Sequence, residues 1–419
     1  MPEQTGTQAP QSAGITRRQA LGGAVLFGAG AATGGLIAGS SEAASAEPQQ
    51  EKVAFYGRHQ AGITTAAQEY LAFAALDTEP SATTSDLRAL LETWSRAAAT
   101  ITAGAPYRPA REVPGAAPID GGEALERGPA RLTVTIGFGP GLFESGRFKL
   151  AAQGPELQQL PTFVGERLEG ARSGGELCVQ ACADDPQVAF HAIHLLSRLA
   201  AGTASLRWTQ LGFGRTSSTT AAQLTPRNLM GFKDGTENIR AEDAAQLRSS
   251  VWVGSETPSW MRGGTYLVAR RIAIKLPGWD QLPLEAQEKV IGRHKQSGAP
   301  LGASKEFDPL PLEKKNASGE HVIPENAHVR LAAAATNGGI RILRRGYSYS
   351  EPTVGGAPIS AGLFFVSFQR SPIDQLIPML TRLSNFDLLN GHTEHTSSAV
   401  FAVPPGAKPG GFVGEGLFA

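Results

Sequence analysis

The feature that most constrains the fold of this 419-residue chain is a strand-then-helix unit that occurs twice. In the first half, the apolar strand-like run 177–183 is followed by 185–200, which begins with Asp-Pro. In the second half, the run 362–369 is followed by 371–384, which begins with Ser-Pro. Asp and Ser are favoured helix N-caps, and proline suits the first helical position. The prolines of the two units lie 186 residues apart, which indicates an internal duplication.

A second pair of segments repeats with a similar offset. The stretch 68–77 resembles 264–274, and their tyrosines lie 196 residues apart, a difference that loops of unequal length account for. Repeated units of strand, helix and strand favour an α+β fold in which helices pack on one face of each sheet. The polar segment 215–228 is the expected linker. The two halves are therefore predicted to span 47–225 and 226–419.

The composition is that of an ordinary globular protein, with 41% hydrophobic and 18% charged residues. Its 38 basic and 38 acidic residues balance, so no overall field points to nucleic acid or an anionic membrane as a partner. The two cysteines, Cys178 and Cys182, lie in the strand-like run 177–183. Four strand residues span about 13 Å, which is too far for a disulfide. Both are therefore expected to be free, buried thiols.

The first 46 residues, 1–46, are predicted to be an export signal and not part of the fold. Arg17 and Arg18 precede a weakly apolar, Gly/Ala-rich run, and Ala-Ser-Ala at 44–46 resembles a signal cleavage site. A membrane anchor is the alternative, but a run poor in Leu, Ile and Phe is unfavourable for stable membrane residence. We therefore expect twin-arginine export to the periplasm, the cell surface or the exterior, with membrane contact only through the signal.

The stretch GFKDGTENIR, at 231–240, raises the question of what Asp234 does. Asp-Gly is a common tight-turn dipeptide, so a surface turn is one interpretation. The other is a carboxylate held in place for chemistry. Phe232 beside charged residues is unusual for a solvated turn, and the polar side chains that follow can form a network around the carboxylate: Thr236, Glu237 and Asn238.

The strand-like run 340–349 favours a buried arginine. Side chains alternate between faces with a period of two, so Arg344 continues the face of the preceding isoleucines, Ile340 and Ile342. An arginine on a buried face needs an anion or a polar cavity. Arg345 points to the other face and is expected at the solvent-exposed rim.

Several histidines have an ordinary structural interpretation. A lone histidine such as His328, one residue before Val-Arg, is more often structural than a ligand. His191 and His194 lie with Arg198 on the polar stripe of the expected helix 185–200, so we predict that they are solvated.

Together, GFKDGTEN, HVR at 328–330 and ILRRGYSYS resemble the dye-decolourising heme peroxidases, and most closely their exported bacterial branch that includes the deferrochelatases. The segments 55–63, 362–369 and 397–406 also resemble that branch, and the likeness extends over 53–419. It implies two ferredoxin-like halves with antiparallel sheets, in a dimeric α+β barrel-like arrangement, that enclose one heme b. That fold agrees with the duplication of strand and helix units.

The resemblance also implies roles for individual residues. It assigns His328 as the proximal ligand of the heme iron, Asp234 as the distal acid–base group and Arg344 as its distal partner. Other positions are expected to contribute to the heme pocket: Leu363 and Phe365 over the distal face, Arg330, Thr236 and Asn238 within the matching motifs, and Glu394 as the acidic partner of His328.

The implied activity is the reduction of hydrogen peroxide with oxidation of dyes, phenols or other reductants. Aromatic residues such as Tyr347, Tyr349, Trp252 and Trp260 either relay electrons to the surface or simply pack. The alternative is a heme- or iron-handling protein of iron uptake that releases iron from heme or oxidises ferrous iron, with an iron permease as partner. Both functions need the same pocket, so the sequence leaves both open, as it does the oligomeric state.

Overall fold

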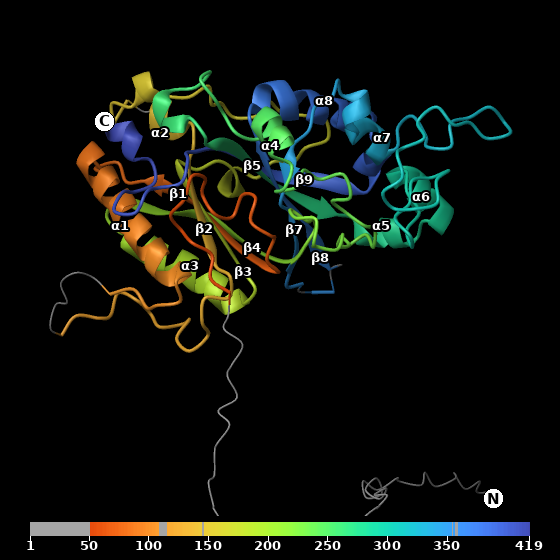
Figure 1. Ribbon diagram of the computed structural model, residues 1–419. Helices are drawn as coiled ribbons and strands as arrows, with labels where there is room; N and C mark the ends of the chain where they lie inside the picture. Colours follow the sequence, from red (N-terminus) through yellow and green to blue (C-terminus); the bar gives the residue numbers. More distant parts are fainter. Residues whose placement is uncertain (1–50, 109–114, 145, 354, 357–358) are drawn as a thin grey trace, which may run out of the picture. The chain divides into compact units, whose positions relative to one another are not determined.

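The computed structural model of the chain is drawn in Figure 1, with the N-terminal sequence in red and the C-terminal sequence in blue. The predicted export signal, 1–46, lies outside the described residues. Within the described residues, no helix is long and apolar enough to cross a membrane. The structure describes residues 51–108, 115–144, 146–353, 355–356 and 359–419.

Nine strands of the described chain form one antiparallel sheet, and eight of them close into a barrel. The strands are β1 (Tyr70–Thr78), β2 (Thr133–Phe138), β3 (Leu177–Ala183), β4 (Ala204–Arg215), β5 (Thr265–Ile274), β6 (Leu343–Arg344), β7 (Tyr347–Glu351), β8 (Ser360–Gln369) and β9 (Thr393–Val403). The barrel order is β5-β9-β2-β3-β1-β4-β7-β8, and β8 pairs back onto β5. The short strand β6 pairs with β8 beside β7.

The strand order within each half confirms the predicted ferredoxin-like fold. The first half has the order β2-β3-β1-β4, and the second half has the equivalent order β7-β8-β5-β9. The two sheets are joined edge to edge by the pairs β2–β9 and β4–β7. The helices are α1 (Thr84–Thr102), α2 (Gly141–Glu144), α3 (Pro186–Leu199), α4 (Ala244–Ser250), α5 (Leu276–Asp280), α6 (Leu284–Ile291), α7 (His328–Ala332) and α8 (Ile377–Phe386).

The helix starts follow from local sequence, as predicted. Asp185 caps α3 by accepting hydrogen bonds from the backbone N–H groups of the second and third helical residues, with proline in the first turn. Ser371 caps the second predicted helix in the same way. Its first turn, Pro372–Leu376, is a π-helix that runs into α8. Thr83 and Asp86 form a capping box at the start of α1.

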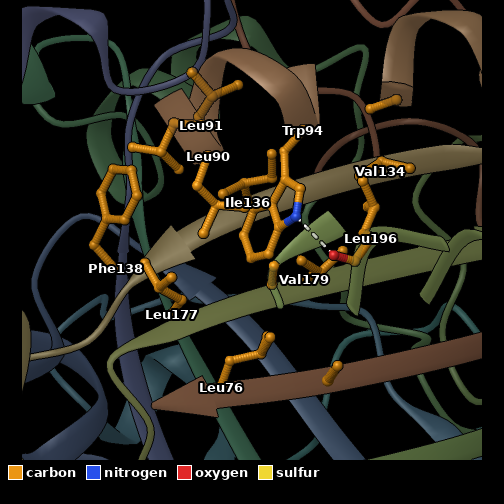
Figure 2. Close-up of a cluster of buried hydrophobic side chains, with 14 of the residues drawn as sticks. Leu76, Leu90, Leu91, Trp94, Val134, Ile136, Phe138, Leu177, Val179 and Leu196 are labelled. Carbon is orange, nitrogen blue, oxygen red and sulfur yellow. Dashed lines mark hydrogen bonds between the residues drawn. The ribbon is translucent and has the colours of Figure 1, made fainter. Parts of the chain in front are cut away.

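The first half packs its helices directly against the outer face of its sheet (Figure 2). Trp94 of α1 is fully buried, and its Nε1 donates a hydrogen bond of 2.8 Å to the Leu196 carbonyl of α3. Strand residues such as Ile136 and Phe138 lie in the same cluster and are also fully buried. This side of the barrel is therefore a tightly packed hydrophobic core.

A second core fills the barrel interior. Phe73 of β1 stacks on Trp208 of β4, with ring centroids 5.2 Å apart, and also contacts Phe364 of β8. The thiols of Cys178 and Cys182 lie in this core, free and buried, which confirms the prediction made for them. Side chains of both halves therefore meet in one interior.

Two surface predictions are wrong. Arg345 is fully buried and not at a rim: it donates to the Thr65 carbonyl and to Gln68 of the first half. The alternation itself holds, but the face that Arg345 shares with Leu343 and Tyr347 points into the closed barrel and not to solvent. His191, expected in solvent, is buried because a loop lies over the polar stripe of α3. His194 on the same stripe remains partly exposed.

Candidate active site

The second half holds a cavity of about 280 Å³ at the outer face of its sheet. Strands β5 and β8 supply one wall, and α7 and α8 supply the other. Along β8, Phe364, Val366 and Phe368 point into the barrel, so Leu363 and Phe365 between them face outwards and line the cavity. The predicted pairing of these two residues on one strand face is confirmed. Most of the exposed surface of the lining is apolar, and charged and polar side chains from several elements also reach it.

Asp234 and Arg344 meet at this cavity. Nη1 of Arg344 donates a hydrogen bond of 2.7 Å to Oδ1 of Asp234, and both residues line the cavity. Asn228 donates to the other carboxylate oxygen at 3.2 Å, a contact that the sequence did not indicate. Both charged side chains are partly accessible, with 16% of Asp234 and 29% of Arg344 exposed. The carboxylate is therefore held from two sides and still open to a small ligand.

The turn around Asp234 depends on Gly235. Its φ is +90°, and a Cβ at this position would lie 2.8 Å from Cα of Ser217. Three residues further on, Asn238 accepts a hydrogen bond from the backbone N–H of Arg344 and donates to its carbonyl, each at 2.9 Å or less. Asn238 is thus a positioning residue for Arg344 and lies behind the cavity lining.

Lys233 and Thr236, which flank this turn, share one partner. Both side chains hydrogen-bond to Glu306, and the Thr236 contact measures 3.1 Å. Thr236 lines the cavity. Lys233, for which the sequence indicated no role, fixes the segment before Asp234 through its ion pair with Glu306.

His328 begins α7 and faces the same cavity. Its Nδ1 lies 2.6 Å from Oδ2 of Asp387, which is almost fully buried. The prediction that Glu394 is the acidic partner of His328 is therefore wrong. Glu394 forms an ion pair of 3.2 Å with Arg167 instead. Because Asp387 occupies Nδ1, the Nε2 atom of His328 is the ring nitrogen left for a ligand.

The charges around the cavity act on His328. Burial alone would lower the pKa of His328, but the charge and the hydrogen bond of Asp387 outweigh it and raise that pKa. Asp234 adds to the rise and Arg344 opposes it. All three groups that the sequence singled out are therefore close enough to influence one another electrostatically.

Arg330 does not reach the cavity. Its guanidinium donates to the carbonyl groups of Ile323 and Leu312, and the side chain is buried. These bonds tie α7 to the preceding loop and so help to place His328 two residues earlier. The predicted contact of Arg330 with a cofactor is replaced by this supporting role.

The first half also contributes to the cavity, which the sequence did not indicate. Phe163 and Glu166 line it, and Glu166 forms a buried ion pair with Arg270 of β5. Just after them, the backbone N–H of Arg167 donates to the carbonyl of His395 on β9 at 2.9 Å. The segment therefore lies along the edge of the cavity and is held there by main-chain and charged contacts.

Comparisons with known proteins agree with this architecture. The sequence model described as "Dyp-type peroxidase, N-terminal" matches residues 60–214, and that described as "Dyp-type peroxidase, C-terminal" matches residues 225–408. The chain belongs to the Dyp-type peroxidases. It is 35% identical to the dye-decolorizing peroxidase of Thermobifida fusca over 95% of each chain. It is 33% identical to the deferrochelatase of Yersinia pseudotuberculosis over 91% of each chain.

A solved structure agrees with the fold and with the cofactor of the family. The ferric form of DtpA from Streptomyces lividans superposes with a TM-score of 0.81 at 40% identity, covering 88% of this chain and 98% of that one. The Dyp-type peroxidase described here is likewise a heme enzyme, and its fold is that of its relatives.

The residues at the cavity fit a heme. An imidazole with a free Nε2, backed by a carboxylate on Nδ1, is a usual donor to heme iron. The apolar wall from β8 and α8 suits the faces of a porphyrin, and cationic side chains suit its carboxylates. Arg341 lines the cavity, is partly exposed and provides such a charge.

Asp387, Glu166 and Asn228 were missed in the sequence because nothing local marks them. Asp387 lies 59 residues after His328, and Glu166 lies 104 residues before Arg270. Asn228 is six residues before Asp234, and its place just ahead of the turn was the one available signal.

Proposed function

We propose that this heme peroxidase activates hydrogen peroxide with Asp234 and Arg344, while His328 holds the heme iron through Nε2. The observation that carries the proposal is the contact of 2.7 Å between Arg344 and Asp234 in the cavity that His328 also faces. Cleavage of a peroxide bond needs an acid–base group and a fixed cation beside the site where the peroxide binds.

When bound, heme supplies the two electrons that reduce peroxide and then recovers them from a reductant. Asp234, as the carboxylate, accepts a proton from hydrogen peroxide and returns it to the departing oxygen, which leaves as water. The guanidinium of Arg344 stabilises the negative charge that develops on that oxygen as the O–O bond breaks. Asp387 keeps the ring of His328 oriented and electron-rich, because its carboxylate accepts a hydrogen bond from Nδ1–H.

The test is the reaction of heme-loaded protein with one equivalent of peroxide, followed by stopped-flow absorbance of the Soret band. Asp234→Asn should retain heme but react about 10²- to 10⁴-fold more slowly, the usual contribution of a positioned acid–base group. Glu237→Gln is the matched control, because Glu237 lies at the same cavity and pairs with Arg341. If Asp234→Asn reacts at the wild-type rate, Asp234 is not the base.

Iron handling is the second candidate function, because curated relatives over nine-tenths of the chain are named deferrochelatases. In this case the protein would take heme as a substrate and release its iron, or would oxidise ferrous iron, with an iron permease as partner. The two functions differ in their products. Release of iron leaves free porphyrin, whose fluorescence can be measured, whereas turnover of dyes or phenols with peroxide at acid pH supports the general peroxidase.

Export through the twin-arginine route to the periplasm, the cell surface or the exterior completes the proposal. It is supported by Arg17 and Arg18, the apolar run after them and the Ala-Ser-Ala site at 44–46. Replacing both arginines with lysine should leave the protein in the cytoplasm of the producing cell. N-terminal sequencing of the exported wild type should begin at Glu47, and export of the lysine variant would contradict this route.

A further inference from the structure

Two carboxylates of the loop 115–127 and two histidines of α3 form a cluster in the first half that shares no residue with the heme cavity. The loop 115–127 lies against the polar stripe of α3, with which it makes several side-chain contacts. Gln187 of α3 donates to the Glu123 carbonyl and Arg198 donates to the Pro118 carbonyl, each at 2.7 Å. The loop is thus clamped at two points, with the cluster between them.

Three side chains of this cluster direct their polar atoms at one point. Nε2 of His191 lies 2.9 Å from Oδ1 of Asp120 and 3.8 Å from Oε2 of Glu123. One donor atom from each of the three residues lies within 4.8 Å of the other two. Only 4% of the His191 side chain is exposed, so this nitrogen is aimed into the cluster from the protein interior.

The carboxylate of Glu123 is only half satisfied. Its Oε1 lies 2.5 Å from Nδ1 of His194, whereas its Oε2 is buried and has no hydrogen-bond partner among the described residues. A buried carboxylate oxygen without a partner is unfavourable and is usually paired or bound to a metal. The position that would satisfy it is the one that His191 and Asp120 also face.

Both carboxylates remain ionised at neutral pH. Burial opposes this, but hydrogen bonds from the backbone of Gly122, from His191 and from the backbone of Tyr107 together lower the pKa of Asp120. Burial is likewise outweighed at Glu123, where its own backbone N–H and the two histidines lower the pKa. The cluster therefore carries two negative charges in a partly buried place.

We propose that Asp120, Glu123 and His191 bind a divalent first-row metal ion, with Zn²⁺ as the reference ion. Imidazole together with carboxylate is a donor set that zinc and its neighbours accept, and a fourth position remains for water. His194 holds the second oxygen of Glu123 and is the positioning residue of the site. Binding of the metal releases to solvent the proton that His191 and Asp120 share. The bound metal then joins the loop to α3.

The experiment uses tag-free, heme-loaded protein treated with EDTA and dialysed. Titration with ZnCl₂ at pH 7 by calorimetry should show one ion per chain, and elemental analysis should find that ion after gel filtration. Glu123→Gln should raise the Kd for Zn²⁺ at least about tenfold, because it removes a ligand charge. Glu126→Gln is the matched control, as Glu126 lies exposed in the same loop outside the cluster.

A second set of measurements keeps the proposal testable if a variant folds poorly. Zn²⁺ should raise the melting temperature of the wild type and not that of Glu123→Gln. Dye turnover should be unchanged in Glu123→Gln. The proposal is wrong if the wild type shows no saturable binding, or if Glu123→Gln binds Zn²⁺ as tightly as the wild type.

Discussion

The two halves of the barrel share one strand order but use the outer face of the sheet in opposite ways. In the first half, α1 and α3 lie directly on the strands, and Trp94 is fully buried between them. In the second half, the corresponding face borders a cavity of about 280 Å³ that holds Asp234, Arg344 and His328. The same fold thus provides a packed core on one side and a cofactor site on the other.

The connections between strands explain this difference. The first half links β1 to β2 through α1, a single capped helix of 19 residues. The second half links β5 to β6 through three short helices, α5, α6 and α7, of 5, 8 and 5 residues. A long amphipathic helix covers a sheet with one continuous apolar stripe, whereas short helices separated by loops cover it incompletely. The gap they leave is where functional side chains can enter.

The largest expected effect comes from truncating a phenylalanine in each half. Phe138→Ala should lower the free energy of unfolding by about 3–5 kcal/mol, because Phe138 is fully buried in the packed core. Phe365→Ala should cost less than half as much in heme-free protein, since one side of Phe365 already faces the cavity. Urea unfolding of both heme-free variants at pH 7 measures this. Equal losses would show that the second half is packed as tightly as the first.

The next effect concerns the support of His328. Asp387→Asn should weaken heme binding about 10- to 100-fold, because the ring loses the carboxylate that accepts its Nδ1 proton. Glu394→Gln is the matched control and should bind heme like the wild type, since its partner is Arg167. Heme titration followed at the Soret band measures both. If Glu394→Gln weakened heme binding more than Asp387→Asn, Glu394 would be the acidic partner.

The smallest effect is the pH dependence of stability that His395 of the second half should cause. Burial, with the positive charge of Arg270, lowers the pKa of His395 to about 3. The unfolded chain takes up a proton at this histidine below about pH 6.5, whereas the folded chain does not, so stability should fall as the pH is lowered from 6.5 towards 3. In urea unfolding of heme-free protein, His395→Gln should lose less stability than wild type between pH 7 and pH 5. If both proteins lost the same free energy of unfolding over this pH range, His395 would not be the cause of the pH dependence.

Much of the fold follows from the local sequence. The caps at Asp185 and Ser371, the alternation that placed Leu363 and Phe365 together, and the free thiols of the barrel are each set by residues a few positions apart. The repeated unit favoured the α+β class, and the resemblance to the dye-decolourising peroxidases implied the two ferredoxin-like halves that the strand order shows. Local periodicity decides these features because backbone geometry is the same wherever the segment lies in the molecule.

What the tertiary structure alone decided is which distant side chains meet. His328 is paired with Asp387 and not with Glu394, and Arg345 is buried against the first half. The choice of the edge strands that join the two sheets, β2 with β9 and β4 with β7, depends in the same way on segments far apart in the chain, as does the burial of His191 under a loop. Such contacts are fixed by packing and by the pairing of buried charges, which no stretch of sequence carries by itself.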